Sequence, residues 1–294
     1  MSTHLTIVDL QEKIPIMRDA HKKTPIQPRL EALEAMINLT NFKLIEPYFI
    51  ENILEIIIDR TDDKPQVSEK AIHLGKDIIS KLSIQAFPRV LQHLFKGLSV
   101  ERKWKIKMGT LTFLEDYINR VEKFDRDLLS SCLPELVTNL TEILYDTKLE
   151  VSELAESVLR KAMKCITNRD LEPFIEDLIK AMKDRNETEE TIQKLAGVVF
   201  VQTVEGSALS VVVPLMVAGL KTNKAIIKRM CARIVSNMSK LVEEPIEALP
   251  FLGELIPTLK DAIDTIADPE AREVATKTHE SLINMNQKAI QEET

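Results

Sequence analysis

Apolar residues recur along this chain at intervals of three and four positions, the spacing that places them on one face of an α-helix. In one such stretch the apolar residues are Leu133, Leu136, Val137, Leu140 and Leu144. A polar turn follows at residues 145–148, and a second pattern of the same kind covers residues 151–163. The sequence here predicts two helices joined by a tight turn.

This unit of helix, turn and helix returns about every forty residues. One marker is a proline that begins or enters the first apolar run of each unit, at Pro47, Pro88, Pro134, Pro173, Pro214 and Pro257. Proline is tolerated in the first turn of a helix, because backbone N–H groups there make no hydrogen bond within the helix. Deeper in a helix it marks a bend. A second marker is a small residue in the second helix, at Ala71, Gly109, Ala155, Ala196, Ala232 and Ala275. Small side chains let neighbouring helices approach closely.

A single helix pair cannot bury its apolar face, so units of this kind stack on their neighbours. We therefore expect an all-α fold, a HEAT/armadillo-type α-solenoid of about six helix-turn-helix repeats with N-terminal capping helices. No Gly/Ser-rich linker divides the chain, and we expect residues 1–294 to be a single domain. Its expected parts are capping helices in 1–42 (roughly Ile7–His21 and Gln27–Asn41), repeats in 43–287 and a frayed tail in 288–294.

Composition agrees with helices and excludes several classes of function. Only 4% of residues are aromatic and 7 are glycine, which is a thin supply for a sheet protein. A net charge of −7 argues against a globally basic nucleic-acid binder but allows local basic patches. The widely spaced Cys132, Cys165 and Cys231 indicate reduced thiols, and neither a signal peptide nor a membrane-length apolar run is present. These features predict a cytoplasmic location.

Several strings occur together in the order of a known family. They are KWKIKMG at 103–109, DTKLEVS at 146–152, FVQTV at 200–204, LSVVVPLMVAGL at 209–220, IKR at 227–229, NMSKLVEEP at 237–245 and DPEAR at 268–272. Over residues 85–285 the chain resembles the N-terminal HEAT domain of fungal translation elongation factor 3, and the related segment of the general-control ribosome-associated scaffold. The resemblance implies contacts with ribosomal RNA and ribosomal proteins.

The resemblance does not extend to the ATPase cassettes of that family. No G-x-x-x-x-G-K-[ST] phosphate loop occurs in the chain, and its glycines are isolated. We therefore expect no ATPase activity, no cofactor and no small-molecule substrate. Either the chain is a stand-alone relative or it is a fragment, and a separate ATPase or regulatory protein is a conceivable partner.

Two groups of cations are the candidate ribosome- or partner-binding residues. The first basic cluster surrounds the single tryptophan at the start of a predicted helix and comprises Lys103, Trp104, Lys105 and Lys107, beside Arg102. The second basic cluster comprises Lys221, Lys224, Lys228, Arg229 and Arg233, with no acid between residues 221 and 240. Lys221, Lys224 and Lys228 would share one face if they were helical. Such clusters can neutralise phosphates.

Each candidate also has an ordinary structural explanation. The lysines could be the solvated face of normal helices, and Trp104 could be a core residue between two helices because its neighbours are all polar. The five histidines are scattered, and none has neighbours at metal-ligand or catalytic spacing. The leading hypothesis is a non-catalytic ribosome-associated scaffold. The alternative is a protein–protein adaptor that holds a peptide or helix of a regulatory partner.

Overall fold

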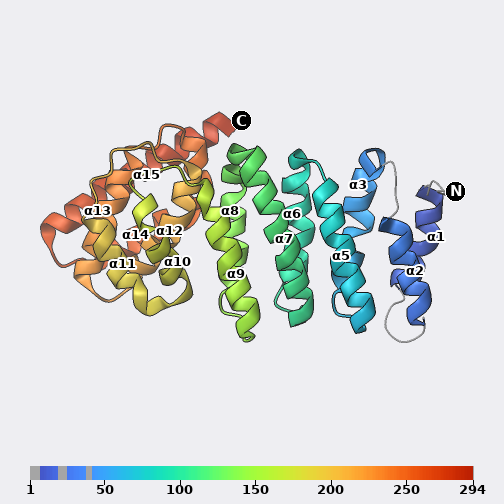
Figure 1. Cartoon of the computed structure of the whole chain (residues 1–294). Coiled ribbons are helices and arrows are strands. Elements are labelled where there is room, and N and C mark those ends of the chain that lie inside the picture. Colours follow the sequence, from blue (N-terminus) through green and yellow to red (C-terminus); the bar gives the residue numbers. More distant parts are fainter. Residues whose placement is uncertain (1–6, 19–24, 38–41, 294) are drawn as a thin grey trace. The chain divides into compact units, whose positions relative to one another are not determined.

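The computed structural model describes residues 7–18, 25–37 and 42–293, which form helices and loops with no strand among them (Figure 1). The chain divides into two compact units. Unit 1 contains Met1–Leu129 and Glu142–Lys161, and unit 2 contains Ser130–Thr141 and Ala162–Thr294. The expected all-α repeat fold is confirmed.

Unit 1 is built from helices that pack on the equivalent helix of the next repeat. Its helices are α1 (Ile7–Arg18), α2 (Ile26–Ile37), α3 (Phe42–Asn52), α4 (Leu54–Arg60), α5 (Pro65–Lys81), the short 3-10 helix η1 (Ile84–Ala86), α6 (Phe87–Leu98), α7 (Trp104–Phe124) and most of α9 (Leu149–Ala162). Helix α4 contacts α6, and α5 contacts both α2 and α7. In Figure 1 helices α5, α6 and α7 lie side by side. The predicted ends of the capping helices, at His21 and Asn41, lie outside the described residues.

Unit 2 repeats the same arrangement. Its helices are the middle of α8 (Arg126–Ile143), η2 (Met163–Cys165), η3 (Glu172–Phe174), α10 (Ile175–Lys183), η4 (Arg185–Glu187), α11 (Thr188–Ala196), α12 (Gly206–Leu220), α13 (Ala225–Ser239), α14 (Pro245–Thr265) and α15 (Pro269–Glu293). The first helices of successive repeats, α10, α12 and α14, contact one another in turn, and so do the second helices α11, α13 and α15.

The small-residue marker works as expected where the helices come closest. A Cβ added to Gly109 of α7 would lie 2.5 Å from the Cγ2 atom of Thr61, which caps α4. Ala71, Ala155 and Ala275 are fully buried. Ala196 differs, because α11 ends at this residue and its side chain is only partly covered. The residue before it, Leu195, is buried, together with Thr188, Thr191 and Ile192 of the same helix.

Most of the proline markers do not lie in first turns. Of the six, Pro88 lies in the first turn of its helix, and Pro173 lies in the 3-10 turn before α10. The others occupy helix interiors, at Pro47, Pro134, Pro214 and Pro257. The helices that hold them begin several residues earlier, because the apolar pattern extends upstream of the proline.

The C-terminal residues also differ from the expected frayed tail. Helix α15 continues through Glu293, and Ala289 is fully buried. Ala289 thus packs against the unit, although most of its neighbours in the sequence are polar. None of the helices in the described part of the chain is long and apolar enough to cross a membrane.

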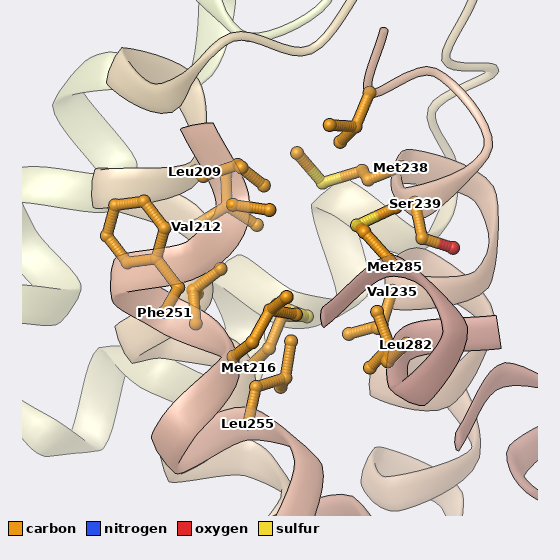
Figure 2. Close-up of a pocket in the computed structure, with 14 residues that line it drawn as sticks. Leu209, Val212, Met216, Val235, Met238, Ser239, Phe251, Leu255, Leu282 and Met285 are labelled. Carbon is orange, nitrogen blue, oxygen red and sulfur yellow. The ribbon is translucent and has the colours of Figure 1, made fainter. Parts of the chain in front are cut away.

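Unit 2 encloses a small apolar cavity between α12, α13, α14 and α15 (Figure 2). Its volume is about 30 Å³, and the side chains around it include Met216, Met238, Leu255 and Met285. A space of this size lies in the range of one water molecule, but the Ser239 hydroxyl, which already donates to the carbonyl of Ser236, is the single polar side chain among the residues that line it, and a buried water needs two to four polar partners. The cavity is therefore a packing gap that flexible methionines partly fill.

Candidate partner-binding surface

Trp104 begins α7 and its indole reaches the surface of unit 1. The residue is 43% exposed, so the alternative explanation, that Trp104 is a core residue between two helices, is wrong. The Nζ atom of Lys105 lies 5.8 Å from the centroid of the ring system, and the Nζ atom of Lys148 lies 5.9 Å from it. At these distances both ammonium groups are attracted to the π-face. We name Trp104, Lys105 and Lys148 the tryptophan platform.

Neither lysine of the tryptophan platform is paired directly with an acid, although the carboxylate of Asp146 attracts Lys148 through space. Within the described part of the chain, Lys105 and Lys148 form no ion pair. Exposed apolar side chains adjoin the platform in sequence, since Val100 is 79% exposed and Leu149 is 64% exposed. The result is an accessible aromatic ring beside two cations. Sequence reasoning missed Lys148 because it lies in a different helix–turn–helix unit.

Lys107 holds the platform together and does not face a partner. Its side chain is 8% exposed, and its Nζ atom donates to Oδ2 of Asp146 at 2.7 Å, where the carboxylate is 10% exposed. Burial alone raises the pKa of Asp146. Hydrogen bonds from Lys107 and from the backbone N–H of Lys148 outweigh that effect and leave the pKa below its ordinary value. This pair ties the turn that carries Lys148 to the start of α7.

Lys103 is exposed and Arg102 is half-buried, and both are matched by acids of the preceding repeat. Lys103 is the N-cap of α7 and its Nζ atom lies 2.6 Å from Oδ2 of Asp62. Arg102 donates from Nη1 to Oδ1 of Asp59 at 2.7 Å. Both pairs are solvent-screened and so contribute little to stability. They lower the free positive charge at this end of the first basic cluster.

The second basic cluster does not form one helical face. Lys221 caps the C-terminus of α12 and Lys224 is the N-cap of α13, so the turn between the helices separates them from Lys228. Lys228 is 8% exposed, and its Nζ atom donates to Oγ1 of Thr265 at 2.5 Å. Its aliphatic stem therefore packs inside unit 2, and its charge is not presented to a partner.

Acids from neighbouring repeats pair with the exposed members of the second basic cluster. Nζ of Lys221 lies 2.9 Å from Glu254, Nζ of Lys224 lies 2.5 Å from Glu189, and Nη1 of Arg229 lies 3.3 Å from Asp268. Arg233 is exposed, and within the described residues it forms no ion pair. The structure thus places acids beside a stretch of sequence that contains cations and no acid, and the resulting surface has mixed charge.

The described residues contain no group of three histidine, cysteine or carboxylate side chains that could hold a metal ion. Burial also disfavours the thiolate form that would bind a metal, because it raises the pKa of the Cys231 thiol to about 12. Paired helices that repeat about every forty residues and pack repeat on repeat define the class: this is a HEAT-type α-helical repeat protein.

Two family models place the chain more narrowly. The model described as EF3 N-terminal HEAT repeat matches residues 7–159, and the model described as Elongation factor 3/GNC1 HEAT repeat matches residues 186–293. The first match alone covers more than half of the chain. The chain belongs to the elongation factor 3 HEAT-repeat family.

Curated relatives agree with this assignment. Elongation factor 3 of Phytophthora infestans is 37% identical over 239 residues, which are 81% of this chain and 22% of the relative. Elongation factor 3B of Saccharomyces cerevisiae is 35% identical over 254 residues, which are 86% of this chain and 24% of the relative. The chain therefore spans less than a quarter of the length of these relatives, and it covers only their HEAT-repeat portion. A computationally designed armadillo repeat protein is similar at a TM-score of 0.31, with 14% identity over 92% of this chain and 99% of that one.

Proposed function

We propose that this chain is a non-catalytic scaffold that binds the ribosome in the cytoplasm, through both ribosomal RNA and ribosomal proteins. Membership of the elongation factor 3 family supports an association with the translation machinery. The observation that carries the proposal is the tryptophan platform, where an exposed indole lies beside two lysines that form no ion pair within the described residues.

The chemistry of the tryptophan platform suits an unpaired base with its phosphates. Stacking of a base on an aromatic ring contributes about 1–3 kcal/mol and tolerates any base. Lys105 and Lys148 can neutralise the adjacent phosphates and release their counterions. An acidic chain needs such a local site, because its net charge of −7 repels RNA elsewhere.

The first test is co-sedimentation of the purified chain with ribosomes. We expect Trp104→Ala to weaken binding about tenfold, which is the loss of one stacked base. Phe124→Ala is the matched control, because Phe124 ends the same helix, is 66% exposed and has Lys123 Nζ 5.3 Å from its ring. Equal binding by the two variants would remove the tryptophan platform from the proposal.

The second test uses salt. Binding to RNA should weaken steeply as the salt concentration rises, and Lys105→Glu with Lys148→Glu should reduce the slope of log affinity against log salt by about 2. Lys277→Glu is the control, since Lys277 is 72% exposed on α15 and pairs with Glu273 of the same helix. A salt-independent interaction would favour the alternative, an adaptor that binds proteins alone.

We also propose that the chain itself does not hydrolyse ATP. It matches only the HEAT-repeat portion of its relatives, and its sequence contains no phosphate loop. Purified chain should release no phosphate from ATP above a buffer blank, with or without ribosomes freed of other factors. Turnover that follows the chain through purification would contradict this part of the proposal.

A further inference from the structure

One buried lysine of unit 2 has a hydroxyl group where an acid would be expected. Lys228 is the fourth residue of α13 and is 8% exposed. Its Nζ atom donates to Oγ1 of Thr265 at 2.5 Å, and within the described residues it forms no ion pair. Lysine side chains are rarely buried without an acid partner, because burial disfavours an uncompensated charge. The ammonium group of Lys228 is therefore positioned for an anion beside Thr265.

The equivalent lysine of unit 1 has such an anion. Lys107 is also buried and is the fourth residue of its helix, α7. It reaches the turn of the next repeat, 39 residues further along, and meets the carboxylate of Asp146 there. Lys228 reaches the turn of its own next repeat, 37 residues further along, and meets Thr265. The same cation thus has a permanent anion in unit 1 and an alcohol in unit 2.

A second cation without an acid partner reaches the turn between α14 and α15. Arg272 donates from Nε and Nη2 to the carbonyl of Ile266, at 2.9 Å and 2.7 Å. In the part of the chain that the structure describes, Arg272 forms no ion pair. Arg229 also reaches this turn, but its Nη1 atom lies 3.3 Å from Oδ2 of Asp268. Two cations at the turn therefore remain available to an anion.

The acids beside Thr265 do not take the place of that anion. Asp268 is matched by Arg229, and its Oδ1 atom accepts from the N–H of Glu270 at 3.2 Å. Asp264 precedes Thr265, is exposed and forms no ion pair within the described residues. Its charge is therefore screened by water, whereas the ammonium of Lys228 is buried.

The hydroxyl group of Thr265 is accessible to an enzyme. Thr265 is the last residue of α14 and is exposed, and residues 266–268 after it are not helical. Its Oγ1 atom donates to the carbonyl of Ala262 at 2.9 Å as well as accepting from Lys228. Asp264 lies one residue before it and Asp268 three residues after it. Acids at such positions are what an acid-directed protein kinase recognises around its target hydroxyl.

We propose that Thr265 is a phosphorylation site of an acid-directed protein kinase, and that Lys228 and Arg272 hold the phosphate. The kinase transfers the γ-phosphoryl group of ATP. A P–O bond forms to Oγ1 as the bond to ADP breaks, and the hydroxyl proton passes to the base of the kinase. The modification adds nearly two negative charges and three acceptor oxygens at the atom that Lys228 already contacts.

Phosphorylation thereby gives this junction the kind of anion that Asp146 gives the equivalent junction of unit 1. It ties α13 to the turn before α15 by charge-assisted hydrogen bonds. The proposal rests on unit 2 alone and is independent of the tryptophan platform.

Phosphorus NMR of the full chain, with phosphothreonine genetically encoded at position 265, tests the pairing. A protein phosphate has a second pKa of about 6, and nearby cations lower it because they favour the dianion. We expect Lys228→Met to raise this pKa by at least about half a pH unit, and Arg272→Gln to raise it too. Lys260→Met is the matched control, since Lys260 is exposed on the same helix as Thr265, and should leave the pKa almost unchanged.

A pKa in Lys228→Met equal to that of the control would overturn the proposal. Circular dichroism checks that each variant folds. If Lys228→Met does not fold, Arg272→Gln decides in the same way, because Arg272 is exposed and its substitution leaves the core intact.

Incubation of the unmodified full chain with ATP and a purified acid-directed kinase of the casein kinase class tests the modification itself. We expect tandem mass spectrometry to find phosphate on Thr265, and Thr265→Val to lose that site. Thr147 and Thr167 are also exposed and have an acid three residues later, so the phosphate must be assigned residue by residue. Folded chain without phosphate on Thr265 would contradict the proposal, whatever the result of the ribosome tests.

Discussion

At the scale of single residues, the pair formed by Lys107 and Asp146 shows how a cation that looks available in the sequence becomes structural. Both side chains are almost fully buried and lie 2.7 Å apart. Two charges that leave water together stabilise a fold only when each compensates the other. The pair therefore acts mainly by fixing one geometry, in which Lys148 lies near Trp104.

Removal of one partner from this pair should cost much more than removal of an exposed one. Lys107→Met leaves a buried carboxylate without its cation, and we expect a loss of about 3 kcal/mol in the free energy of unfolding. Lys107→Met with Asp146→Leu should restore most of that loss. Lys103→Met is the control and should change stability by less than about 0.5 kcal/mol, because Lys103 is 72% exposed. Urea unfolding measures all three variants.

Acid should release the same interaction. The folded-state pKa of Asp146 lies below its ordinary value of 3.8, so its contribution is present above that pH and is lost as the pH falls below about 4. The stability of Asp146→Asn should consequently fall less between pH 5 and pH 3, measured by urea unfolding at each pH as an order-of-magnitude comparison. Parallel curves for the two proteins would contradict the assignment.

Glycines offer a second contrast between single positions. Gly109→Ala should cost about 1–3 kcal/mol, because its new methyl group would overlap Thr61. Gly253 lies inside α14 with nothing within 4 Å of an added Cβ, so Gly253→Ala should stabilise by about 0.5–1 kcal/mol. Shifts of opposite sign in the urea midpoint are the expected outcome. Two shifts of the same sign would show that helix propensity outweighs the close approach.

At the scale of elements, the anchoring of the loop between α11 and α12 depends on one carboxylate. Asp170→Ala removes the acceptor shared by the N–H groups of Val201 and Gln202. Their amide exchange should become at least about tenfold faster, the effect expected of a lost charged hydrogen bond. Asp184→Ala is the control, because Asp184 accepts from the N–H of Asn186 in another turn. Exchange that is equally fast in both variants would indicate general loosening of unit 2.

The helical elements follow from the sequence, and the surface that they carry follows only in part. Periodicity and small residues give the helix pairs because core burial repeats every three to four positions. The partners of Lys221 and Lys224 lie 33 and 35 residues away, beyond any helix-length window. Contacts between repeats can be identified only when the stacking of the helices is known.

At the scale of the whole molecule, unit 1 holds the only tryptophan, so Trp104 fluorescence reports on that unit while circular dichroism reports on all helices. Leu255→Ala enlarges the apolar cavity of unit 2 and should cost about 2–4 kcal/mol there. Repeat proteins unfold regionally when neighbouring units are coupled weakly. We expect the circular dichroism midpoint in urea to fall more than the fluorescence midpoint.

Leu114→Ala in unit 1 is the companion experiment. Leu114 is fully buried in α7, and its truncation should move the fluorescence midpoint of Trp104 directly. If both variants shifted both midpoints by equal amounts, the two units would unfold as one cooperative body. That result would contradict regional unfolding.

The ion pairs between repeats have a consequence for how such a chain can change over generations. Lys221, Lys224, Lys103 and Arg102 each meet an acid 33–43 residues away, which is the length of one repeat. The junctions that carry these pairs therefore have charges that match only their own neighbours. A repeat duplicated or transplanted by recombination would keep its hydrophobic fit but meet foreign charges at both borders. Substitutions within a repeat should therefore be tolerated more readily than a change in the order of the repeats.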